Sequence, residues 1–424
     1  MTDATITVIV LAFAIVMFVL ERIPLAATAM IVALSLSVFR VLTPAQAFAG
    51  FVNSSVILFV GMFVISGALF ETGMAAKAGR LILRFAKTER QLMATTMIAT
   101  GLLGAIMSNT AVAAVFLPIV IGIATQSGFS KSRLLLPMAY AATMSGSLTL
   151  ISTPGNLIAH GLLQEHGHAG FSFFGLGLVG FPLLIVGTLF FCIFGPKLLP
   201  AEDRSVQQEV SSKDFSDIPA WKQRMSVIVM IFTIIGMIVS DQINIPGLPL
   251  HVIAAIGALT LVVTKVITEQ QAYTAIEWKV VFLIAGTFPL ATALETTGVG
   301  MSFAHGVLAL LGENATPFAV TAVIFLIAVA LTSFISNTAT IALLAPIAIS
   351  IALTMGADPR AAAAATVVGA AMSFATPVST PPNTMVVAHG GYKFTDYVKA
   401  GVPLTIVTGM VALILLPIVF PFFP

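Results

Sequence analysis

The run 317–353, PFAVTAVIFLIAVALTSFISNTATIALLAPIAISIAL, carries the polar triplet Ser336-Asn337-Thr338 near its centre. A straight helix crosses the hydrocarbon core of a membrane with about 20 residues, so this apolar run is too long for one span. Because three polar residues interrupt it, the run predicts two short helices that meet at a tip inside the membrane. Ser, Asn and Thr are preferred N-cap residues, so the second helix is expected to begin at the triplet.

The same pattern occurs in the first half of the chain. The run 91–125 is also mainly apolar and carries Ser108-Asn109-Thr110 at its centre. At both tips, the start of the second helix would present free backbone N–H groups and the positive end of its dipole to the protein interior. Such helix ends bind anions. The two hairpins therefore predict an anion site.

The composition identifies a membrane protein. Of the 424 residues, 58% are hydrophobic and 8% are charged, and the mean hydropathy is +1.07. This length is enough for roughly ten spans with short loops. The first apolar stretch, 6–20, lacks a basic leading region and a cleavage site, so it is expected to be a span and not a signal peptide. The single cysteine, Cys192, excludes an intramolecular disulfide or a thiolate metal cluster.

The chain is expected to consist of two halves with the same order of elements. The first half, 1–196, contains spans at about 5–21, 24–42 and 54–70, a basic amphipathic segment at 77–90, a hairpin at about 91–126, a broken span at about 133–163 and a span at about 171–196. The second half, 225–424, contains spans at about 225–240, 248–266 and 278–294, an amphipathic piece near 300–312, a hairpin at about 317–355, a broken span at about 360–390 and a last span at about 397–421. The polar segment 197–224 is expected to be a cytoplasmic linker.

Matching residues recur at a nearly constant spacing. Ser108 and Ser336 lie 228 residues apart, and the Ser-Thr-Pro-x-Asn motifs of the two broken spans begin at Ser152 and Ser379, 227 residues apart. A spacing this regular indicates an internal duplication.

The charge distribution predicts how the two copies lie in the membrane. Each copy has five spans and one hairpin, and an odd number of spans inverts the second copy. With the N-terminus outside, all of the 19 Lys and Arg residues except Arg40 and Arg360 fall on the cytoplasmic side, as the positive-inside rule requires. The predicted fold is an all-α polytopic membrane protein with two inverted repeats, each of five spans, a re-entrant helical hairpin and one broken helix. Secondary transporters have this architecture.

The four interruptions are expected to cluster, because non-helical backbone at membrane depth needs a protein or cavity environment. Pro154 and Pro381 suit the first turn of a resumed helix, with Ser152 and Thr153, and Ser379 and Thr380, as expected caps. The four motifs contain no Arg, Lys, Asp or Glu. If the substrate is a dianion, helix N-termini alone supply only fractional positive charge, and co-bound cations are then expected; Na⁺ suits ligation by oxygen atoms.

These residues also carry a family resemblance. The paired Ser-Asn-Thr triplets, each followed by a Thr-Pro-x-Asn break, resemble the divalent anion:sodium symporter family of di- and tricarboxylate and sulfate carriers. The segment that begins at Phe374 and contains Pro377, Ser379 and Asn383 is similar to that family's signature. The resemblance covers nearly the whole chain.

The resemblance implies the residues of the sites. The substrate site would be lined by Asn109, Thr110, Thr153, Pro154, Asn337, Thr338, Thr380 and Pro381. One Na⁺ would be held by Ser108, Asn109 and the backbone of Ser152, and another by Thr332, Asn337 and the backbones of Ile335 and Ser379.

The implied function is secondary active transport of small divalent anions, dicarboxylates such as succinate first, by Na⁺-coupled symport. The family moves its hairpins and broken helices as an elevator against a dimeric scaffold. We therefore expect a homodimer in the bacterial inner membrane, with the lipid bilayer and a small anion as partners and no nucleic acid.

Three residues depart from the family pattern. Gly104 stands where a serine hydroxyl is expected, which predicts a weaker first cation site; Ala371 and Gly155 replace a serine and a proline. A sulfate or tricarboxylate carrier, an anion exchanger without Na⁺, a cation/proton antiporter and a metalloid efflux permease stay open as alternatives. An enzyme is not expected, because the sequence has no H-E-x-x-H motif and no cysteine nucleophile.

Four titratable residues lie near span ends or breaks and could have other roles. Glu71 and Glu295 are expected to be interfacial or structural, and His160 and His389 to be packing residues, with proton relay as the alternative for the histidines.

Overall fold

The computed structural model describes residues 2–83, 88–200, 215, 217–243, 245–312 and 316–423. Throughout these ranges the regular structure is helical, with no strand. Helices satisfy their own backbone hydrogen bonds, which lipid cannot do for them. Eight of the described helices are long and apolar enough to cross a membrane. The predicted all-α membrane fold is confirmed.

The two halves have the same sequence of α-helices, and the first half also contains two 3-10 helices, η1 (Ala49–Val52) and η2 (Ser145–Ser147). The first half contains α1 (Asp3–Leu20), α2 (Leu25–Val38), α3 (Pro44–Phe48), α4 (Ser54–Glu71), α5 (Met74–Leu83), α6 (Glu89–Gly104), α7 (Asn109–Ser127), α8 (Lys131–Met144), α9 (Pro154–Glu165) and α10 (Gly177–Leu198). The second half contains α11 (Ala220–Ile243), α12 (Leu250–Val263), α13 (Glu269–Ala275), α14 (Trp278–Thr296), α15 (Val299–Leu311), α16 (Pro317–Thr332), α17 (Asn337–Thr354), α18 (Pro359–Ala370), α19 (Pro381–Gly390) and α20 (Phe394–Val419).

The helices fall into the predicted kinds. Long unbroken spans are α1, α4, α10, α11, α14 and α20, whereas α2 and α12 are shorter apolar helices. The broken spans are α8 with α9 and α18 with α19, and the hairpins are α6 with α7 and α16 with α17.

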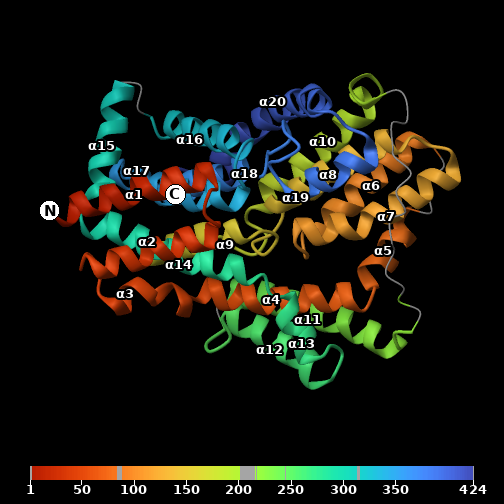
Figure 1. Ribbon diagram of the computed structural model, residues 1–424, viewed down its shortest axis with the longest axis horizontal. Coiled ribbons are helices and arrows are strands. Elements are labelled where there is room, and N and C mark those ends of the chain that lie inside the picture. The colour runs from red at the N-terminus through yellow and green to blue at the C-terminus, as the bar shows by residue number, and fades with distance from the viewer. Residues whose placement is uncertain are drawn as a thin grey trace.

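The hairpins lie at opposite ends of the molecule, with the broken spans between them (Figure 1). Each hairpin packs on the first arm of its own broken span: α6 and α7 contact α8, and α16 and α17 contact α18. The resumed arms cross to the other half, because α9 packs against α17 and α19 against α7 and α8. The two halves therefore interlock around the breaks.

Some boundaries differ from the sequence prediction. The chain leaves the helix already after Met144 and Ala370, so each break is longer than its Ser-Thr-Pro motif. The basic segment begins earlier, as α5 from Met74, and its residues 84–87 lie outside the described residues. Most of the predicted linker, 201–214 and 216, also lies outside them, and α11 begins at Ala220.

Candidate anion-binding site between the hairpins and the broken spans

The second arm of each hairpin begins at its polar triplet, as predicted. Ser108 and Ser336 are the N-cap residues of α7 and α17. Each serine Oγ accepts a hydrogen bond of 3.3 Å from a backbone N–H three residues later, that of Ala111 or Ala339. This cap satisfies one of the free N–H groups at the helix start and fixes the chain direction at the tip. The Asn-Thr pair that follows opens the first turn.

Each hairpin tip is tied to the broken span of its own half. Thr149 Oγ1 donates a hydrogen bond of 2.5 Å to the carbonyl of Ala105, which follows α6. In the second half, Thr376 Oγ1 donates one of 2.6 Å to the carbonyl of Ser333, which follows α16. The predicted neighbourhood of tips and breaks is present in both halves.

Two side chains hold the first break in place. Ser152 Oγ lies 2.8 Å from the carbonyl oxygens of both Gly146 and Thr149. Asn156 Nδ2 donates to the same two carbonyls, at 2.7 and 2.8 Å. Buried carbonyls need partners, and these side chains supply them where the helix does not continue.

The second break repeats this arrangement. Ser379 Oγ lies 3.0 and 3.1 Å from the carbonyl oxygens of Ser373 and Thr376, and Asn383 Nδ2 donates to both at 2.8 and 3.0 Å. All four positions are those of the first break plus 227. The duplication seen in the sequence therefore extends to hydrogen bonds at the centre of the molecule.

The expected capping by Ser152, Thr153, Ser379 and Thr380 is wrong for the side chains. Thr153 and Thr380 are the N-cap residues of α9 and α19, but neither side chain makes a cap hydrogen bond. The two serine hydroxyls instead bond to carbonyls of the break. Pro154 and Pro381 have no N–H of their own. The other N–H groups in the first turns of α9 and α19 receive no side-chain cap from Thr153 or Thr380.

All four motifs line one cavity of about 480 Å³. The starts of α7, α9, α17 and α19 therefore meet at a single space. The motif residues that line it are Ser108, Asn109, Thr110, Ser152, Thr153, Pro154, Ser336, Asn337, Thr338, Ser379, Thr380 and Pro381. We call this space the four-motif cavity.

The four-motif cavity is suited to an anion. Four helix N-termini each contribute a fraction of a positive charge and free N–H donors. Thr110 and Thr338 lie in the first turns of α7 and α17 and line the cavity, so each places a hydroxyl group at its wall. They can therefore donate to a ligand.

The expected cation ligands lie in the wall of this cavity or directly behind it. Asn337 Oδ1 lies 2.9 Å from the hydroxyl of Thr332, which also donates to the carbonyl of Ala370 at 2.8 Å. Thr332 and Ile335 are fully buried behind Asn337 and do not line the cavity themselves. Both are next to the tip of the second hairpin.

The first half obtains the corresponding hydroxyl from another element. Position 104 is glycine, but Ser145 Oγ lies 3.3 Å from Asn109 Oδ1. A Cβ at Gly104 would lie 2.1 Å from that same Oγ, so the glycine leaves room for Ser145. Sequence reasoning missed Ser145, because its relation to Asn109 depends on how the break packs on the hairpin.

Two charged residues of the cavity were also missed. Glu277 and Lys279, at the start of α14, line the four-motif cavity beside the motifs. In the sequence they look like ordinary charges at a membrane interface. Burial raises the pKa of the Glu277 carboxyl, and Lys279 opposes that shift. Glu277 also lines an adjoining cavity of about 570 Å³, together with Glu71, which accepts a hydrogen bond of 3.3 Å from Gln271.

Packing explains why position 155 is a glycine. A Cβ at this position would lie 2.2 Å from Cδ1 of Ile341 on α17. The larger Pro382 stands at the matching position of the second half. Close approach of α9 to α17 thus explains the departure of the first motif from a double proline.

Proteins with known names resemble this chain over most of its length. Residues 15–369 match a family model described as citrate transporter. The uncharacterized transporter YfbS of Escherichia coli (strain K12) is 25% identical, over 97% of this chain and 98% of its own. The sodium-dependent dicarboxylate transporter SdcS of Staphylococcus aureus (strain USA300) is 24% identical, over 95% of this chain and 84% of its own.

Solved structures share the fold. The YdaH transporter of Alcanivorax borkumensis, described as having an unusual topology, superposes with a TM-score of 0.66 at 17% identity, over 90% of this chain and 88% of its own. The MtrF protein of Neisseria gonorrhoeae, of a class of antimetabolite efflux pumps, gives a TM-score of 0.58 at 15% identity, over 89% of this chain and 83% of its own. At these identities the likeness establishes the fold and no more.

Proposed function

Because the chain belongs to the citrate transporter family, we propose that it carries small di- or tricarboxylate anions across the plasma membrane through the four-motif cavity. The family and the relatives are transporters, so the chain is a multi-pass membrane transporter and not an enzyme. The earlier resemblance to di- and tricarboxylate carriers is confirmed. The choice of anion, the coupling and the movement are the proposal.

One observation carries the proposed substrate class. Four helices begin at one cavity, and none of the motif residues there is acidic. A dicarboxylate can divide its two charges between the starts of helices from opposite hairpins, where Thr110 and Thr338 offer hydroxyl donors. Succinate has this chemistry, and the family description names citrate.

We assign Na⁺ the role of co-transported ion. The first site is Ser108, Asn109 and the backbone of Ser152, now with Ser145 beside Asn109. The second is Thr332, Asn337 and the backbones of Ile335 and Ser379. Side-chain and backbone oxygens suit a hard cation. SdcS, which is described as sodium-dependent, is a relative at low identity.

The proposed movement is an elevator. The hairpins and broken spans pack mainly among themselves and with α10 and α20, whereas α4 packs with α11 and α12, and α2 with α14. The four-motif cavity lies between these two groups, because Phe63 of α4 and Val280 and Leu283 of α14 complete its wall. Sliding of the first group along the second would move the anion. The homodimer implied by the resemblance belongs to the same proposal.

Uptake into proteoliposomes tests the proposal. Purified protein would be assayed with radiolabelled succinate, citrate and sulfate, with a Na⁺ gradient and with an equal K⁺ gradient. We expect succinate or citrate to accumulate, and Na⁺ to raise the rate. Accumulation of none of the three would overturn the substrate class. Accumulation that ignores Na⁺ but follows an internal counter-anion would replace symport by exchange.

A further inference from the structure

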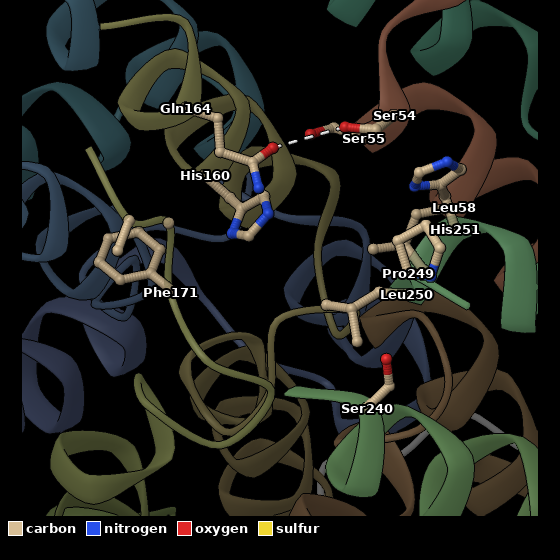
Figure 2. A pocket seen from close by; sticks show the side chains of 12 residues that line it. Ser54, Ser55, Leu58, His160, Gln164, Phe171, Ser240, Pro249, Leu250 and His251 are labelled. Atoms are coloured by element: carbon tan, nitrogen blue, oxygen red, sulfur yellow. Dashed lines mark hydrogen bonds between the residues drawn. The ribbon is translucent and has the colours of Figure 1, made fainter. Parts of the chain in front are cut away.

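A second cavity, of about 340 Å³, lies away from the four-motif cavity and shares none of its lining residues. It lies where α4 and α12 begin and α9 and α11 end, with the loop residues 169–171 along one side (Figure 2). Under the predicted orientation, this end of the helices faces outward. We call it the second cavity.

Two helices start at the second cavity. Ser54 and Ser55 form the first turn of α4, and Leu250 and His251 form the first turn of α12. The side chain of Asn53 caps α4, but Pro249 offers no side-chain cap to α12. Both helices have more than a dozen residues, so their dipoles are well developed at this point. The N-termini alone would not make a site.

Two buried polar atoms give independent evidence for a ligand. Ser55 Oγ has no hydrogen-bond partner among the described residues, and His160 Nδ1 has none of good geometry, although the backbone of Phe171 interacts with the His160 ring. The two residues are 1% and 6% exposed, and both line the second cavity. Figure 2 shows the His160 ring extending from α9 into this space. Buried polar atoms are nearly always satisfied, so these two point to a bound group with hydrogen-bonding atoms.

Two glycines pack closely beside these atoms. A Cβ at Gly170 would lie 2.3 Å from His160 Nδ1, and a Cβ at Gly161 would lie 2.8 Å from Ser55 Oγ. Any side chain at these positions would therefore press on these two atoms.

The lining chemistry selects the charge of the ligand. No Asp or Glu is among the described residues that line the second cavity. The polar side chains there are serines, histidines and Gln164, and Ser54 and Gln164 are within 3.4 Å of each other across its edge. Together with two positive helix ends, these donors suit negative oxygen atoms.

We propose that the second cavity binds a small oxyanion, such as a carboxylate or sulfate, independently of the four-motif cavity. The bound oxygens would accept hydrogen bonds from Ser55 and His160 and from the first turn of α12. The oxyanion is either the transported anion on its way to the four-motif cavity or a separate ion that binds from the same side.

Protection of an engineered cysteine tests this inference. In the full chain with Cys192→Ser and Ser54→Cys, a membrane-impermeant thiol reagent would label position 54 in nanodiscs. Sodium sulfate and disodium succinate are the probes, and sodium gluconate at equal ionic strength is the control. We expect labelling to slow about elevenfold when the probe is ten times its dissociation constant. Slowing by sulfate and succinate assigns a general oxyanion site, and slowing by succinate alone assigns the transported carboxylate.

Two further variants separate this site from the transport site. Protection should persist when Thr110→Ala and Thr338→Ala are added, and should be lost with Gly170→Ala or Ser55→Ala in protein that keeps the wild-type elution profile and thermal stability. No protection by either probe overturns the inference. Protection that disappears with Thr110→Ala and Thr338→Ala also overturns it, because the signal would then come from the four-motif cavity. Failure of uptake, by contrast, would leave the protection result intact.

Discussion

At the scale of single residues, the two hairpin tips place a hydroxyl beside an asparagine amide by different routes. Thr332 of α16 lies beside Asn337, whereas Ser145 of the first break lies beside Asn109. The counterpart of Thr332 is Gly104, whose missing side chain leaves room for Ser145. The expectation of a weaker first cation site considered Gly104 alone. Ser145 supplies a hydroxyl beside Asn109 that this expectation did not include.

This pair predicts how the cation sites respond to mutation. Ser145→Ala and Thr332→Ala each remove one hydroxyl and keep the asparagine. We expect both to raise the Na⁺ concentration needed for half-maximal uptake, Thr332→Ala more strongly, because its contact is shorter, 2.9 against 3.3 Å. Gly104→Ser should impair uptake by crowding Ser145. A Na⁺ titration of initial rates is the measurement, with Thr354→Ala in α17 as control, and unchanged curves for both variants would remove these hydroxyls from cation binding.

The hydroxyls of Thr110 and Thr338, which line the four-motif cavity, should contact the anion. We expect Thr110→Ala and Thr338→Ala each to raise the KM for the anion roughly tenfold or more, since a hydrogen bond to a charged group contributes about 1.5–3 kcal/mol. Thr125 and Thr354 lie at the far ends of the same helices and bond to backbone carbonyls, so their alanine variants are matched controls. The measurement is the KM for the anion, obtained from initial uptake rates of the wild type and each variant. Wild-type values in both triplet variants would place the anion elsewhere.

Glu277 predicts a pH dependence. Burial raises the pKa of its carboxyl against the opposing charge of Lys279, so it stays protonated to a higher pH than a free glutamate. Below the raised pKa the cavity wall is neutral there, and above it a negative charge repels the anion. The KM for the anion should therefore increase as the pH rises through this pKa on the side of the membrane at which α14 begins.

The substitution Glu277→Gln should abolish that increase and keep the low KM at all pH values. Glu71 lines the adjoining cavity and is a second carboxylate on this side, so Glu71→Gln is measured in parallel. Glu269→Gln, which changes an exposed carboxylate on α13, serves as the control. A pH profile that is the same in wild type and Glu277→Gln would exclude this carboxyl.

At the scale of elements, the sequence predicted most where the physical signal is local. The start of α7 after Ser108 and of α17 after Ser336 follows from N-cap chemistry within four residues. The prolines at the start of α9 and α19 are equally local. Order and kind of nearly all helices could therefore be predicted.

The missed features depend on contacts between distant segments. The breaks begin seven and eight residues before Ser152 and Ser379, because these serines, with Asn156 and Asn383, bind the freed carbonyls from further along the chain. Helical propensity gives no sign of such partners. Ser145 and the charged start of α14 reach the cavity only through packing, so no spacing in the sequence would reveal them.

At the scale of the whole molecule, equivalent positions of the two repeats should lie on opposite sides of the membrane. Ala45 on α3 and Gln270 on α13 are such a pair, 225 residues apart, and both are exposed. In a Cys192→Ser background, we expect a cysteine at position 45 to be labelled only from outside and one at 270 only from the cytoplasm. An impermeant thiol reagent applied to right-side-out and inverted vesicles gives the answer. Labelling of both from one side would contradict the inversion.

The central claim is that two interlocked repeats bring four helix N-termini to one anion. A cryo-EM structure of the protein in nanodiscs with saturating anion, chosen from the uptake panel, tests it most directly. We expect the carboxylate groups in the four-motif cavity, beside the first turns of α7, α9, α17 and α19 and within hydrogen-bond reach of Thr110 and Thr338. An empty four-motif cavity, with the anion bound only elsewhere, would contradict the claim.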